Sequence, residues 1–141
     1  MKYVIIINDF SINSCYLSNM KGFTGDIEKI TLENDFFRKV IFTSDNLQLV
    51  VMSLLPGEDI GEEVHENVDQ FFRLEEGEGK IIMDGQETEV EEDDVIIVPK
   101  GTRHNLINTS SHDHLKLYTI YSPPNHKDGT IHKTKEETVE A

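Results

Sequence analysis

The hydrophobic positions of the chain fall in short runs, separated by turn residues about every ten positions. Runs of this kind, bounded by Gly, Pro, Asn and Asp, are typical of β-strands, and no stretch keeps the period of an amphipathic helix. The predicted strands cover residues 1–8, 26–32, 36–43, 47–55, 70–75, 80–83, 87–90, 95–98, 103–108 and 114–121. The pattern therefore predicts an all-β protein, an antiparallel sandwich or barrel.

Turn residues sharpen this prediction at several points. Asp84-Gly85 separates two short strands and is among the strongest local signals for a β-hairpin. Residues 9–25 are polar and rich in turn formers, and we expect no regular element there. Pro123-Pro124 ends the last long strand, and the polar residues after it show no apolar period, so they are predicted to form a tail.

Size and charge narrow the possible partners. The chain has 141 residues, which favours one domain, and 37% of them are hydrophobic, enough to bury a core. There are 27 acidic residues against 13 basic ones, a formal net charge of −14. Such a surface repels phosphate backbones and anionic lipids, so we expect neither nucleic acid nor membrane as a partner.

The N-terminal region bears on compartment and assembly. Lys2 precedes an apolar run at residues 3–7 that Asp9 interrupts, which is too short for a secretion signal. The single cysteine, Cys15, rules out an intrachain disulfide and favours a reducing, cytoplasmic location. The run at residues 3–7 is an apolar strand with an exposed edge, and we therefore expect a homodimer.

Two stretches carry candidate chemistry. The first begins at a Pro-Gly turn and places Glu63 and His65 two residues apart, which puts both side chains on one face of a strand. Gln70 follows, and the stretch ends at Gly77. The second runs from Asp93 through Pro99-Lys100-Gly101 to His104 and Asn108.

Taken together, these stretches resemble the two signatures of the cupin superfamily. The first signature has Gly, His-x-His, Glu and Gly, and the second has Gly, Pro-x-Gly, His and Asn. In this chain Glu63 replaces the first His, Gln70 replaces the Glu and Asp93 replaces the second leading Gly. The resemblance implies a cupin double-stranded β-helix, or jelly-roll barrel, over residues 45–122. Residues 1–44 would then supply strands that complete the barrel or the dimer, and residues 123–141 the polar C-terminal tail.

The resemblance also implies a metal site in the barrel mouth. Glu63, His65, Gln70 and His104 fall on the ligand positions of the family. Two imidazoles and one carboxylate form a facial triad that suits Zn, Fe, Mn or Ni. The alternative is a barrel whose altered ligands no longer hold metal, with Glu63 part of the acidic surface. Asp69 competes with Gln70 as the fourth ligand.

Other residues are weaker candidates. Asn108 shares a strand face with His104 and would line a substrate pocket, although a turn-bonding role is favoured. Tyr118 or Tyr121 would line the same pocket, because one parity of the last strand must face inward, although a core-packing role is favoured. Arg103 is expected at the surface. The remaining histidines, expected to be exposed, are His112, His114, His126 and His132.

Three functions fit these observations. The chain is similar to the short cupins grouped with mannose-6-phosphate isomerases, which implies a metal-dependent enzyme acting on a small polar metabolite, such as a sugar phosphate. In that case Glu63, if it does not bind the metal, could move the proton. The ligand set also fits a non-haem iron dioxygenase. The third possibility, suggested by the altered ligand positions, is a ligand-binding or structural cupin without catalysis.

Overall fold

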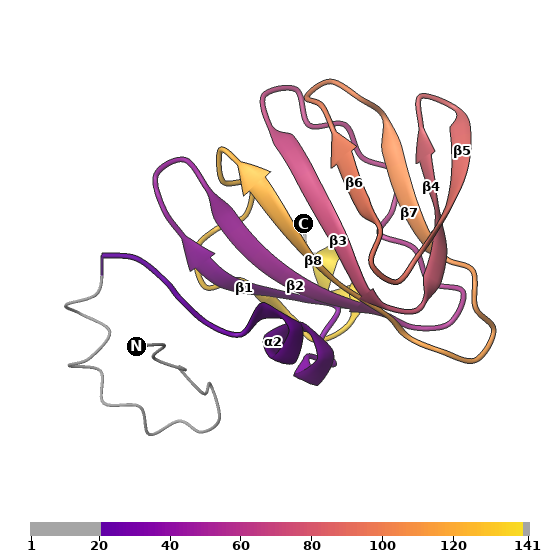
Figure 1. Cartoon of the computed structure of the whole chain (residues 1–141). Helices are drawn as coiled ribbons and strands as arrows, with labels where there is room; N and C mark the ends of the chain where they lie inside the picture. Colours follow the sequence, from indigo (N-terminus) through magenta and orange to yellow (C-terminus); the bar gives the residue numbers. More distant parts are fainter. Residues whose placement is uncertain (1–20, 140–141) are drawn as a thin grey trace.

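The computed structural model describes residues 21–139 and confirms the all-β prediction (Figure 1). The described elements are α2 (Ile27–Glu33), β1 (Arg38–Thr43), β2 (Gln48–Leu54), β3 (Asp69–Glu76), β4 (Glu78–Met83), β5 (Gln86–Glu91), β6 (Val95–Val98), β7 (His104–Asn108), β8 (Leu115–Ser122), β9 (Ile131–His132) and the 3-10 helix η1 (Lys135–Val139). The strands from β1 to β8 match those expected from the alternation of residues, with small differences at their ends.

The strands form two antiparallel sheets. The larger has the order β6-β3-β8-β2-β1-β9, and the smaller has the order β5-β4-β7. Alternate side chains of both sheets point into one core, with Phe72, Leu74, Leu106 and Leu117 all fully buried. This two-sheet arrangement is the jelly roll that the sequence predicted.

Two turns of the jelly roll require a positive φ angle. Gly77, between β3 and β4, has φ 99°, and a Cβ there would lie 2.7 Å from the carbonyl oxygen of His114. Asp93, where the family signature has Gly, has φ 75°. Asp tolerates this left-handed region better than most residues, and Arg73 Nη2 donates to the Asp93 carboxylate at 2.8 Å. The replacement of Gly by Asp93 therefore keeps the turn.

The prediction of a strand at residues 26–32 is wrong, because these residues form most of helix α2 (Ile27–Glu33). Asp26 caps the helix by accepting a hydrogen bond from the backbone N–H of Lys29 at 3.2 Å. The ammonium of Lys116, on β8, donates to two carbonyl oxygens at the other helix end, at 2.8 and 2.9 Å. The helix packs on β8, β3 and β2, so tertiary contacts stabilise a helix too short to form alone.

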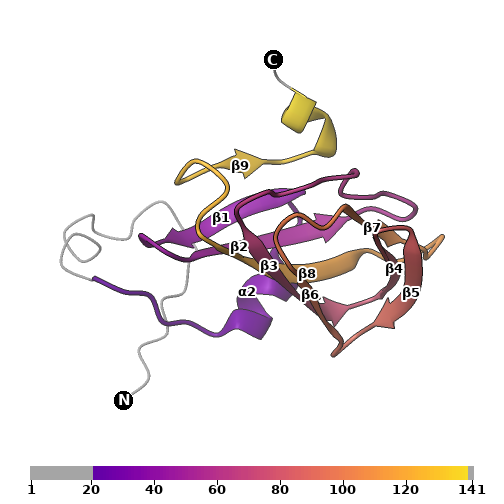
Figure 2. The ribbon, with the colours of Figure 1, turned by 90° about the horizontal axis from the view of Figure 1, so that it is seen from above.

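The end of the chain contains regular structure where a featureless tail was predicted. Strand β9 pairs with β1 at the edge of the large sheet, and Figure 2 shows β9 and α2 on opposite sides of β1 and β2. The buried amide of Gln48 accepts from the backbone N–H groups of Asn125 and His126, at 3.1 and 2.9 Å. His114, His126 and His132 are half-buried, so the expectation that all three are exposed is wrong, whereas His112 is exposed as expected.

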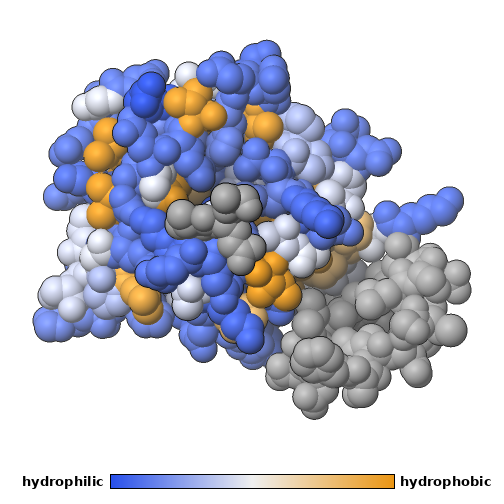
Figure 3. All heavy atoms as spheres, turned by 180° about the vertical axis from the view of Figure 1, so that it is seen from behind, coloured by the Kyte–Doolittle hydropathy of each residue, from blue (hydrophilic) through white to orange (hydrophobic). Residues whose placement is uncertain are grey.

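Several predictions fall on residues outside those described, namely the first strand, the dimer-forming run at residues 3–7 and Cys15. Within residues 21–139, no helix is long and apolar enough to cross a membrane. The face seen in Figure 3 is mostly hydrophilic, with its apolar side chains in separate small groups, as expected from the net charge of −14.

Candidate metal centre

Two distant segments meet at the start of β7. Glu63 lies in the connection between β2 and β3, and it forms an isolated antiparallel bridge with His104. Each residue donates its backbone N–H to the carbonyl of the other, at 2.9 Å in both directions. His65 follows two residues after Glu63, and the carbonyl of His65 accepts from the N–H of Gly101 at 2.8 Å. The second signature therefore holds the first one in place through backbone hydrogen bonds.

The side chains of Glu63, His65 and His104 converge. The Oε2 atom of Glu63 lies 3.1 Å from Nε2 of His65, and the two imidazole centroids are 5.4 Å apart. One candidate ligand atom from each residue can be chosen so that all three lie within 4.8 Å of one another. This spacing allows a single ion to contact all three at ordinary metal–ligand distances.

The orientation of His104 is the most informative feature of the group. The ring is 1% exposed, and its Nδ1 lies 2.9 Å from the carbonyl oxygen of Thr102. A carbonyl only accepts, so Nδ1 carries the proton and Nε2 presents a lone pair. Within residues 21–139 this buried Nε2 has no hydrogen-bond partner. A histidine whose second nitrogen is fixed by a carbonyl, with its first nitrogen unpaired, has the arrangement of a metal ligand.

Gln70 lies beside this group. It is 2% exposed, and its Nε2 donates to the hydroxyl of Thr119 at 3.0 Å. Its Oε1 is buried and has no partner among the described residues. Gln70 pairs with Tyr121 in the β3–β8 ladder, and the Tyr121 ring packs against His65 at 5.9 Å. An unpaired carbonyl oxygen suits a weak fourth ligand or a contact to a bound water.

Charge in the group is set by Glu63. Burial raises the pKa of Glu63, but the hydrogen bond with His65 and the nearby positive charge of Arg38 outweigh it. The net pKa lies below its ordinary value, so Glu63 is a carboxylate at neutral pH. The group therefore offers one negatively charged carboxylate and two imidazole rings to a cation.

Two neighbouring side chains are neutral. Tyr121 is 1% exposed, and burial raises the pKa of its hydroxyl above the ordinary value. Its oxygen lies 3.3 Å from Nε2 of His126. Burial, followed by the charge of Arg38, lowers the pKa of His126 to about 4. Both groups are therefore uncharged at neutral pH and add polarity without charge to this end of the core.

Comparison with known proteins agrees with this geometry. The family model described as "Cupin domain" matches residues 50–121, which include Glu63, His65 and His104. The chain belongs to the cupin family. The mannose-6-phosphate isomerase group is not singled out by these similarities.

Three relatives are similar to this cupin over most of its length. The protein YrkC of Bacillus subtilis is 46% identical over 127 residues, covering 86% of this chain and 68% of that protein. The protein L612 of Acanthamoeba polyphaga mimivirus is 44% identical over 110 residues, covering 75% of this chain and 68% of its own. The crystal structure of BH2720 from Bacillus halodurans has a TM-score of 0.83 at 43% identity, covering 87% of this chain and 97% of its own. None of these names states an activity.

The remaining predicted pocket residues lie elsewhere in this cupin. Tyr118 is on the opposite face of β8 from Tyr121 and packs on Phe71, with ring centroids 6.3 Å apart. Asp69, the rival fourth ligand, is exposed and accepts from the N–H of Lys100 at 2.8 Å. Of the two tyrosines weighed for the pocket, Tyr121 is therefore the one near His65.

Asn108 has a structural environment. Its amide donates to the carbonyls of Leu54, Leu55 and Asp113, at 3.1, 3.1 and 2.8 Å. Its Oδ1 accepts from the N–H of Ser110 at 3.0 Å. These bonds use the whole amide to hold two loops, as the favoured turn-bonding interpretation expected.

Sequence reasoning missed two groups near the centre, Arg38 and His126. Arg38 occupies an inward position at the start of β1, so a charged residue on the buried parity of a predicted strand was a signal for it. No local signal marks His126, because its burial depends on the contacts of Gln48 with the chain segment after β8.

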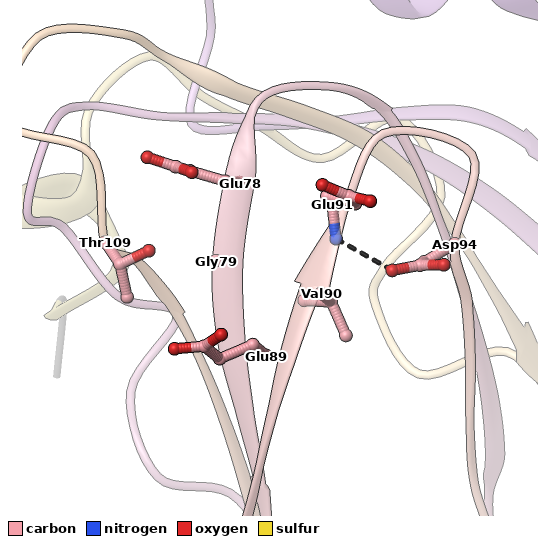
Figure 4. A pocket seen from close by; sticks show the side chains of 7 residues that line it. All are labelled: Glu78, Gly79, Glu89, Val90, Glu91, Asp94 and Thr109. Carbon is pink, nitrogen blue, oxygen red and sulfur yellow. Dashed lines mark hydrogen bonds between the residues drawn. The ribbon is translucent and has the colours of Figure 1, made fainter.

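A polar hollow of about 500 Å³ lies at the end of the small sheet opposite to His104 (Figure 4). Four carboxylates line it, those of Glu78, Glu89, Glu91 and Asp94. The Asp94 carboxylate accepts from the backbone N–H of Glu91 at 2.8 Å, and the three glutamates are exposed. This hollow contains no buried, unpaired ligand atom of the kind found at His104.

Proposed function

We propose that this cupin binds a divalent metal ion through Glu63, His65 and His104 and uses it on a small polar metabolite. The observation that carries the proposal is the buried, unpaired Nε2 of His104, fixed in direction by the carbonyl of Thr102. Leaving a polar atom buried without a partner costs about 1–3 kcal/mol, which a bound ligand would recover.

When bound, a divalent ion would supply Lewis-acid polarisation of a substrate oxygen. The residues of the chain then have distinct roles. Glu63 contributes the charge that selects a cation, and the backbone bridge to His104 fixes its position. Tyr121 and His126 remain neutral, so they can orient a polar substrate by hydrogen bonds without repelling the metal.

The first test is metal binding. Protein purified without chelators should contain close to one divalent ion per chain by elemental analysis. Chelated protein should take up Co²⁺ with the visible absorption of a bound ion. Variant His104→Ala should lose this signal, whereas His112→Ala, which alters an exposed loop histidine, should keep it. Wild-type protein that neither retains nor binds a metal would contradict the proposal and favour a non-catalytic binding or structural cupin.

The reaction has two candidate classes. Two histidines and one carboxylate favour a non-haem iron dioxygenase, because this set leaves coordination positions open. Oxygen uptake by Fe²⁺-loaded protein with phenols and diketones tests that class. The sugar-phosphate isomerase predicted earlier is tested by turnover of a sugar-phosphate panel by the metal-loaded protein, and inertness there would count against it.

Names of distant neighbours do not choose between these classes. KdgF from Halomonas is 19% identical with a TM-score of 0.58, and a predicted oxalate decarboxylase from Thermotoga maritima is 23% identical with a TM-score of 0.52. At these identities, both similarities indicate a shared fold and nothing about activity. The homodimer also remains a prediction, which sedimentation of the full chain would test.

A further inference from the structure

Arg38 is a buried cation without a matching anion. It begins β1, the side chain faces inward, and the residue is 5% exposed. In residues 21–139, no carboxylate lies within 4.0 Å of its guanidinium. The other arginines described, Arg73 and Arg103, each form an ion pair with a carboxylate. A buried guanidinium without a counter-ion is costly, so this arrangement calls for a binding partner.

One edge of the Arg38 guanidinium is already used and the other is free. Nη1 lies 3.3 Å from Nδ1 of His132, the residue paired with Arg38 across the β1–β9 ladder. Nε is buried and has no partner among the described residues, and Nη2 has no hydrogen bond there either. Nε and Nη2 form the edge that binds a planar carboxylate by two parallel hydrogen bonds.

The charge of Arg38 acts on groups of the metal centre. Burial is the largest influence on the pKa values of Glu63, Tyr121 and His126, and the positive charge of Arg38 lowers all three. Of these three groups only Glu63 is charged, and the proposed metal ion would engage that charge. The charge on Arg38 would then remain available to a ligand.

We propose that Arg38 binds a carboxylate of the substrate, so that the substrate is a small organic acid held between the metal ion and this guanidinium. This inference rests on the proposed function. A carboxylate matches both the single positive charge and the planar free edge. A phosphate carries more charge than one guanidinium offsets, and the described residues include no other buried arginine.

The test uses three diacids of increasing length, malonate, succinate and glutarate, each beside its monomethyl ester. The Co²⁺-loaded protein is titrated by calorimetry, and the cobalt absorption band reports whether the metal stays bound. In each pair one carboxylate remains for the metal, and the ester removes the charge that Arg38 would bind. We expect at least one diacid to bind the wild type about tenfold more tightly than its ester, or about 1.4 kcal/mol.

The same pairs are then titrated into Arg38→Gln, Arg38→Lys and the control Arg73→Gln. Arg73 lies on the outer face of β3 and is paired with Asp93 at 2.8 Å, so its loss should leave the preference intact. Arg38→Gln should abolish the preference, and Arg38→Lys should keep part of it. If Arg38→Gln does not fold, a diacid preference in Arg38→Lys below that of the wild type would support the inference, and an unchanged preference would overturn it.

Failure of the inference differs from failure of the proposed function. A wild type without a cobalt band would refute the metal site itself. A normal cobalt band with no diacid preferred over its ester would overturn the inference alone. A preference that survives Arg38→Gln would do the same. Inorganic phosphate is a further arm, and phosphate binding that depends on Arg38 where no diacid shows such dependence would also overturn it.

Discussion

Strand β7 carries a buried polar side chain near each end, and the two have opposite environments. His104 and Asn108 are each 1% exposed and lie on the same face of the strand. The Nδ2 atom of Asn108 donates its two hydrogens to three surrounding carbonyl oxygens, one of them shared, and Oδ1 accepts one N–H. The imidazole of His104 has one nitrogen bonded to Thr102 and the other unpaired within residues 21–139.

This difference separates a structural polar residue from a candidate ligand. The fully paired amide rigidifies two loops and has nothing left to offer a substrate. The imidazole of His104 keeps one buried nitrogen unpaired, which costs free energy that a bound ligand would recover. Such an atom is typical of a functional site. Burial alone therefore does not identify a site, because both residues are equally buried, and the pairing of each atom decides.

Removing the imidazole should have the largest effect. His104→Ala deletes the proposed buried metal ligand, and we expect Co²⁺ affinity to fall about 1,000-fold, or about 4 kcal/mol. The free energy of unfolding of the metal-free protein should change by less than about 1.5 kcal/mol, because the variant also removes an unpaired buried nitrogen. Calorimetric titration and urea unfolding measure the two quantities. An affinity within tenfold of wild type would contradict the ligand assignment.

Removing the amide should do the reverse. Asn108→Ala leaves three carbonyls and one N–H without their partner, and we expect a loss of about 3 kcal/mol in the free energy of unfolding. Metal affinity at a temperature where the variant is folded should be unchanged. The neighbouring exposed residue provides the control, since Thr109→Ala should alter stability by less than about 0.5 kcal/mol. A large effect of Asn108→Ala on Co²⁺ binding would place Asn108 in the site after all.

The sequence predicted those features of the fold and the site that depend on local spacing. The alternation of residues placed strands β1 to β8, and the spacing of Glu63 and His65 placed both side chains on one face. The structure brings these two together with His104, as expected. Spacing could not show the unpaired state of His104 Nε2, because that depends on every atom that folds around it.

Contacts between segments distant in sequence explain the errors. Strand β9 is only two residues long and is held by β1, far away in the chain. Helix α2 is seven residues long and depends on packing against the large sheet and on Lys116. Neither element has a strong local pattern of its own. His126 was overlooked for the same reason, because its burial depends on the contacts of Gln48 with the segment after β8.

The carboxylates of Glu63 and Glu89 allow the metal centre to be compared with the acidic surface. Glu63→Gln keeps the shape of the side chain and removes its charge from the converging group, so we expect Co²⁺ affinity to fall about 100-fold, or about 2.7 kcal/mol. Glu89→Gln makes the same change in the acidic hollow of Figure 4 and should leave affinity unchanged. Calorimetry with each variant measures the difference. Equal losses in both would mean that general surface charge, and not the centre, attracts the metal.

The smallest expected effect concerns His126, the half-buried imidazole beside Tyr121. Its pKa of about 4 in the folded protein lies below the ordinary value of 6.5, because burial disfavours the charged form. The unfolded chain therefore binds more protons than the folded one between these two values, and stability falls as pH drops through that window. From pH 7 to pH 5 we expect His126 to account for a loss of about 1 kcal/mol, allowing for its partial exposure. Urea unfolding of metal-free wild type and His126→Phe at both pH values measures it, and the variant should lose less stability on acidification. Equal losses in the two proteins would mean that the pKa of His126 is the same in the folded and the unfolded chain, so that burial does not lower it.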